Sequence, residues 1–118
     1  MLNTFNANAN ADQAAYDRIR DTETHLRRHG RGLCDLLDAL DAPGGFDALC
    51  ELHGFFGTQH PNADEIAEAL AEIERALEAQ TASAADRIAR DYCFDASSAI
   101  RWHGARISEL RRRFQDAK

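Results

Sequence analysis

Valine is absent from this chain, and alanine fills 22 of its 118 positions. Six isoleucines and five threonines are the only β-branched residues. Strands favour β-branched residues, whereas alanine has the highest intrinsic helix propensity. The composition therefore predicts an all-α fold, in a chain of the length of one domain.

Apolar residues near the N-terminus follow a heptad spacing. Ile19, Leu26 and Leu33 lie seven residues apart, which places them on one helix face and predicts a helix over about 11–41. Pro43 and the two glycines after it predict a turn, because proline lacks the N–H that continues a helix and glycine accepts positive φ.

The rest of the chain contains three further segments with helical apolar spacing. The clearest start is at Asn62, whose side chain can cap a helix together with Glu65 three residues on. The last segment keeps its spacing without a gap and is predicted as one helix, and residues 94–98 are the single point at which its sequence would allow a break. We therefore predict three helices after the turn, over about 46–56, 62–80 and 84–116.

The lengths of these helices constrain the architecture. At 1.5 Å per residue the first would span about 45 Å and the last about 50 Å, too long for a spherical fold of this size. We predict an elongated antiparallel bundle of four helices, the first and last long, with a homodimer as an alternative way to cover the apolar stripes. The polar residues 1–9 are expected to be disordered, and 10–118 to form the single domain.

Charge and cysteine content bear on the compartment. Three cysteines without a C-x-x-C pair are typical of a reducing environment, and no apolar run approaches the roughly 20 residues of a membrane span. A net charge of -6 argues against a chain that coats DNA or membranes. We therefore expect a bacterial, cytoplasmic protein that does not associate with membranes.

Histidine and cysteine pairs are the first candidates for chemistry. His25 and His29 are four residues apart and Cys50 and His53 three, so each pair could direct two ligands from one helix face. In a straight hairpin the two pairs would lie more than about 10 Å apart, which is too far for them to bind one metal ion together. A His/Cys metal-binding bundle is therefore an alternative and not the main prediction. The sequence has no Glu-x-x-His, haem-attachment or phosphate-loop motif, and we expect neither enzyme activity nor a cofactor.

Acidic and aromatic residues indicate a protein contact instead. A row of carboxylates follows one side of the helix after Asn62 and could occupy a basic groove on a partner protein. Two glycine-flanked phenylalanines, one expected to face the core and one the surface, and an outward tryptophan are candidate anchors. The predicted protein-binding residues are Phe55, Phe56, Trp102, Asp64, Glu65, Glu68 and Glu72. We predict a non-enzymatic binding module: an adaptor, an assembly factor or a small acidic inhibitor of the kind that phages and other mobile elements encode.

The C-terminal third of the chain carries an alternative function. Residues 82–118 hold eight basic and five acidic residues, whereas 1–81 hold six and fifteen. Within this basic part, residues 88–102 resemble a helix-turn-helix motif, in which Ala89 matches the small residue of the first helix and Cys93 stands in place of the usual turn glycine. The resemblance implies a DNA-binding regulator using residues 88–106, with nucleic acid contacted by Ser97, Ser98, Arg101 and Arg106.

Overall fold

The computed structural model describes residues 2–58, 62–80, 82–92 and 95–116, and these residues form five helices and no strand. The all-α prediction is confirmed. The helices are α1 (Leu2–Ala39), α2 (Pro43–Phe56), α3 (Ala63–Glu78), α4 (Ala82–Tyr92) and α5 (Ala96–Asp116).

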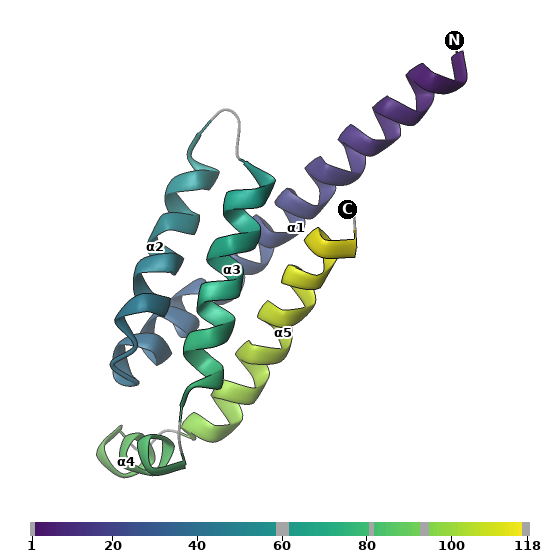
Figure 1. Cartoon of the computed structure of the whole chain (residues 1–118). Coiled ribbons are helices and arrows are strands. Elements are labelled where there is room, and N and C mark those ends of the chain that lie inside the picture. Colours follow the sequence, from purple (N-terminus) through teal and green to yellow (C-terminus); the bar gives the residue numbers. More distant parts are fainter. Residues whose placement is uncertain (1, 59–61, 81, 93–94, 117–118) are drawn as a thin grey trace.

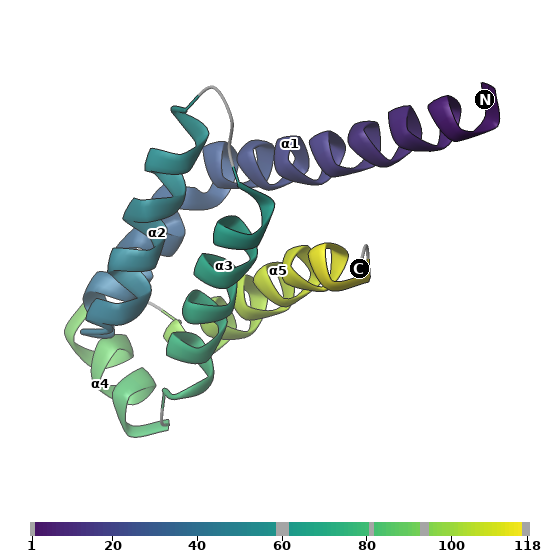
Figure 2. The ribbon, with the colours of Figure 1, turned by 45° about the horizontal axis from the view of Figure 1, so that its top comes forward.

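Helices α2 and α3 run side by side, α1 and α5 pack against them at an incline, and α4 lies across one end of these four helices (Figure 1). In the packing, α2 contacts α1 and α3, while α5 contacts α3 and α1. The seam between α2 and α3 therefore lies opposite the seam between α1 and α5. The molecule measures 63 × 24 × 20 Å, because the N-terminal turns of α1 project beyond the other helices (Figure 2). The elongated shape agrees with the prediction from helix length.

The core lies between α1, α2, α3 and α5, and α4 closes its end. Leucines and isoleucines on the predicted apolar stripes are buried here, and the first heptad row places Leu26, Leu33 and Leu40 inside. The most fully buried apolar side chains are Leu33, Leu36, Leu37, Leu49, Leu52, Ile66, Leu70, Ile73, Ile88 and Ile107. Within the described residues, no helix is long and apolar enough to cross a membrane.

The start of α5 corrects the prediction of four helices. The last helix was expected to run unbroken over about 84–116, but α4 ends at Tyr92 and α5 begins at Ala96. Asp95 caps the new helix: its carboxylate accepts the Ser98 N–H at 3.1 Å and the Ser98 hydroxyl at 2.7 Å. A side chain that satisfies a free N–H in the first turn favours a helix start at that point. Cys93, the predicted turn position, lies outside the described residues.

The turn between α1 and α2 also differs from the prediction. Pro43 is the first residue of α2, where its missing N–H costs nothing, and the chain reverses at Asp41 with φ at 54°. The Asp41 N–H donates to the Asp38 carbonyl at 3.0 Å, and the Ala42 N–H donates to the Leu37 carbonyl at 3.1 Å. These two bonds form a Schellman motif that ends α1.

Gly45 serves packing rather than a turn. It is a buried helical residue of α2, and a Cβ built on it would lie 2.7 Å from Ala76 Cβ and 2.9 Å from Leu37 Cδ2. Carbon atoms in contact prefer about 3.5–4.0 Å. The absent side chain therefore allows α2 to approach both α1 and α3 closely at this level.

The first residues of α3 and α1 relate differently to the sequence prediction. The Asn62 cap is confirmed, because its Oδ1 accepts the Asp64 N–H at 2.9 Å and the Glu65 N–H at 3.1 Å. In contrast, α1 begins at Leu2 and not near residue 11. Residues 2–9 are thus included in α1.

Candidate functional site

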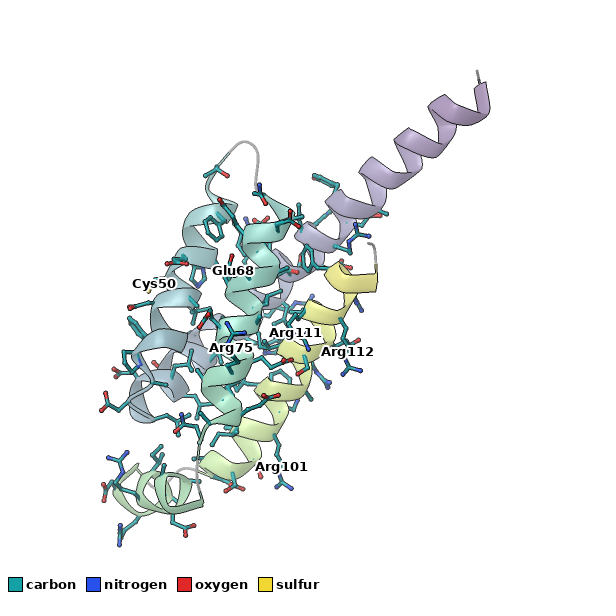
Figure 3. All side chains as sticks on the ribbon, in the orientation of Figure 1. Cys50, Glu68, Arg75, Arg101, Arg111 and Arg112 are labelled. Atoms are coloured by element: carbon teal, nitrogen blue, oxygen red, sulfur yellow. The ribbon has the colours of Figure 1, made fainter. Side chains whose placement is uncertain are left out.

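A groove of about 700 Å³ lies along the seam between α2 and α3. Its floor is apolar or small, and its rims carry carboxylates from both helices. The lining residues are Gly44, Asp47, Ala48, Glu51 and Phe55 from α2, and Glu65, Glu68, Ala69 and Glu72 from α3. Figure 3 shows Glu68 on the outward side of α3.

Helical spacing explains why these carboxylates line up. On α2, Asp47, Glu51 and Phe55 are each four residues apart, so they stand above one another on one face. On α3, Glu65, Glu68 and Glu72 follow the same three- and four-residue spacing. Because the two helices are adjacent and antiparallel, their rows face each other across the groove (Figure 1).

The groove is strongly negative. The stretch 43–78 carries eight acidic residues and one arginine, Arg75. Arg75 forms a salt bridge with Glu72 one turn away, and this is the only salt bridge that the described residues make with any of the five groove carboxylates. Like charges at this spacing repel one another, so an incoming cation would relieve the repulsion.

A different contact fixes α3 against α5, away from the groove. Glu74 Oε1 lies 3.0 Å from Arg111 Nε, and the Glu74 carboxylate also accepts the Ser108 hydroxyl. Burial alone would raise the pKa of Glu74, but the hydrogen bond from Ser108 and the positive charge of Arg111 outweigh burial and lower that pKa. This carboxylate is therefore structural and is not available to a partner.

The two phenylalanines at the end of α2 project on different sides of it. Phe55 lines the acidic groove, whereas Phe56 lines a hollow against α1 with Leu26 and Arg27. The sequence predicted one core and one surface residue, but both are half-buried and pack against the core. Adjacent side chains on a helix point in different directions, as expected. Phe55 therefore lies toward α3, and Phe56 lies toward α1.

Trp102 lies at the contact between α5 and α1, with 39% of its surface exposed. Its ring centroid is 6.1 Å from that of His25, 4.8 Å from that of His29 and 5.0 Å from that of His103. The Arg106 guanidinium carbon lies 5.1 Å from the Trp102 ring centroid, a cation–π distance. The predicted outward tryptophan is therefore partly covered by a cluster of histidine rings that the sequence did not reveal.

The helix-turn-helix residues are only partly arranged as the resemblance implies. The chain does break between α4 and α5, and Arg101 is exposed on α5 (Figure 3). However, Ala89 is exposed and does not pack between the two helices, and the Ser98 hydroxyl is bonded to Asp95. Arg106 lies against Trp102.

The proposed metal ligands are not brought together. His25 and His29 face Trp102, whereas Cys50 is exposed on α2 and the His53 ring lies over Gly30. Among the residues that the structure describes, no three histidine, cysteine or carboxylate side chains are close enough to hold a metal ion.

Three of the four predicted acidic residues line the groove, and Asp64 lies in a neighbouring hollow between α3 and α5. Sequence reasoning missed Asp47 and Glu51. Their four-residue spacing with Phe55 lay inside the predicted helix over about 46–56 and was a usable signal. The spacing did not specify that these residues would face the acidic row of α3.

No protein-family model matches this chain, and searches of curated proteins and of solved structures find no match either. A function must therefore be inferred from the geometry of the molecule. The acidic groove brings five carboxylates together around a floor of small and apolar residues.

Proposed function

We propose that this chain is a non-enzymatic protein-binding module whose acidic groove receives a basic amphipathic helix of a partner protein. The observation that carries the proposal is the pair of facing carboxylate rows above an apolar floor between α2 and α3. An adaptor, an assembly factor and a small inhibitor would all use such a contact.

The dimensions of the groove suit a helix. The lining residues of α2 run from Gly44 to Phe55, a length of about 17 Å or three helical turns. Small floor residues, Ala48 and Ala69, would let a partner helix approach closely. Phe55 at one end offers an aromatic surface against which an apolar partner residue could pack. A suitable partner would therefore carry an apolar stripe of about three turns flanked by arginine or lysine.

Charge complementarity defines the partner further. Asp47 and Glu51 on one wall and Glu65 and Glu68 on the other have no salt-bridge partner within the described part of the chain. Oppositely charged surfaces speed association and exclude wrong partners, and their contribution falls as salt is added. Binding should therefore weaken strongly with ionic strength.

The test uses a labelled amphipathic peptide of about 15 residues, built from alanine, leucine and arginine. Fluorescence anisotropy would give its Kd at about 50 mM and about 300 mM salt. The double variant Glu51→Gln/Glu68→Gln removes one charge from each wall and should weaken binding about tenfold. Glu78→Gln, on the same α3 but outside the groove, is the matched control and should change Kd less than about twofold.

Two results would contradict the proposal. One is equal affinity for a peptide in which glutamate replaces arginine. The other is equal weakening by the groove variant and by Glu78→Gln, which would trace the effect to net charge and not to the groove.

A further inference from the structure

The histidine rings around Trp102 are the second unusual feature of the molecule, on the face opposite the groove. His103 on α5 is 9% exposed, and its Nδ1 is buried without a hydrogen-bond partner in the described structure. On α1, His25 Nε2 is buried and unpartnered in the same way. The His25 and His29 ring centroids are 5.0 Å apart.

The backbone of α1 is shaped to hold this cluster. A Cβ on Gly32 would lie 3.7 Å from His103 Nε2, so the imidazole rests directly on the glycine. A neutral imidazole has one donor and one acceptor, and a protonated one has two donors. Each buried, unpartnered nitrogen would therefore have to find a new acceptor or reach water on protonation.

The charges around the rings do not offer that compensation. His25 faces His29, Arg106 and Glu109. Beside it is a hollow of about 430 Å³, and Arg28 is one of the residues that line this hollow. Glu109 and Asp21 on its rim are both bonded to Arg113, at 3.4 Å and 3.0 Å.

On the other side, His103 lines a hollow of about 480 Å³ with Asp35 and Asp38 of α1. The α4 side of this hollow presents the apolar Ile88. The described residues contain no hydrogen bond or salt bridge between either aspartate and the His103 ring.

Burial lowers the pKa of His103, and the nearby His25 and His29 lower it further. Burial likewise lowers the pKa of His25, with His29 and Arg106 adding to the effect and Glu109 opposing it. A histidine whose pKa is lower folded than unfolded stabilises the fold fully above its unfolded pKa of about 6.5. That stabilisation is lost as the pH falls from there toward the folded value.

We propose that these rings form a pH-operated latch between α1 and α5: in mildly acidic solution, proton uptake by His25 and His103 loosens α5 from α1 at this point and uncovers Trp102. The latch is independent of the acidic groove, because it lies across the bundle from it. Helix α5 keeps its Glu74–Arg111 attachment to α3 while the latch opens, because that carboxylate stays ionised in this range.

Trp102 is the only tryptophan of the chain, so its fluorescence reports on the latch alone. We would measure quenching by acrylamide at about pH 8 and about pH 5.5, with far-UV circular dichroism alongside, because the ordinary histidine pKa lies between these values. From an exposure of 39%, the quenching constant should rise by roughly twofold while helicity is kept. An unchanged quenching constant would overturn the proposal.

The variant His25→Phe/His103→Phe keeps ring volume and removes both titrating groups, and it should abolish the pH-dependent rise. His53→Phe changes an exposed histidine outside the cluster and should retain the rise. A rise that persists in the double variant would overturn the proposal.

If the double variant does not fold, the imidazole C2–H resonances of the unaltered chain decide the question. His25 and His103 should titrate below about pH 6.5, together with the change in quenching. Titration at or above that value would overturn the latch.

Discussion

Gly45→Ala tests the close packing that sets the spacing of α2 and α3. The new methyl group would lie 2.7 Å from Ala76 Cβ, about 1 Å inside the usual carbon–carbon contact. Overpacking of this kind costs about 1–3 kcal/mol, whereas replacing glycine by alanine in a helix gains up to about 1 kcal/mol. The net loss of stability should be about 0–3 kcal/mol.

Gly44→Ala is the matched control, because a Cβ on the neighbouring glycine meets nothing within 4 Å. It should gain up to about 1 kcal/mol, so the two variants should differ by about 1–3 kcal/mol. Urea unfolding would measure the difference directly, and Tm should differ by roughly 3–6 °C per kcal/mol. Equal stability of the two variants, within about 0.5 kcal/mol, would refute the close approach of the helices at Gly45.

Three further predictions concern the turn, the α3–α5 contact and the alternative function. Asp41→Gly should raise stability by about 0.5–1 kcal/mol in urea unfolding, because glycine adopts a φ of 54° without strain; a loss would show that the aspartate has another role. Glu74→Gln should lower stability by about 1–2 kcal/mol at pH 7, and the difference should shrink below about pH 4.5, because the stabilising carboxylate of the parent then becomes protonated; a difference independent of pH would argue against its ionisation. In a mobility-shift titration we expect no DNA complex at about 0.15 M salt, and a complex that Arg101→Ala abolishes would favour the helix-turn-helix alternative.

The sequence was most informative where one residue type has one structural consequence. The absence of valine indicated a helical protein, and Asn62 indicated a helix start that the side chain does cap. It was least informative where a residue serves two purposes. Gly45 suggested a turn because glycine accepts positive φ, but it is helical and is required by the approach of Ala76.

Local pattern and tertiary packing also compete in the last third of the chain. The apolar spacing runs through residues 93–95 without interruption, because the buried Ile88 and Ala96 keep a helical register across the break. Asp95 ends that continuity by capping α5 through Ser98.

For the candidate site, the acidic row of α3 was visible in the sequence. Its facing partners on α2 and the histidine cluster depend on which helices become neighbours, which spacing alone does not specify.

The great length of α1 has a consequence for how the molecule rotates in solution. At 1.5 Å per residue its 38 residues span about 57 Å, nearly the full 63 Å of the long dimension. A rod of these proportions tumbles more slowly end over end than about its own axis. Amide N–H bonds lie along their helix axis, so those of α1 and those of α4, which lies across the bundle end, sample different rotations (Figure 1). The ratio of longitudinal to transverse ¹⁵N relaxation times should accordingly be higher in α1 than in α4. This difference would report the orientation of α4 relative to α1.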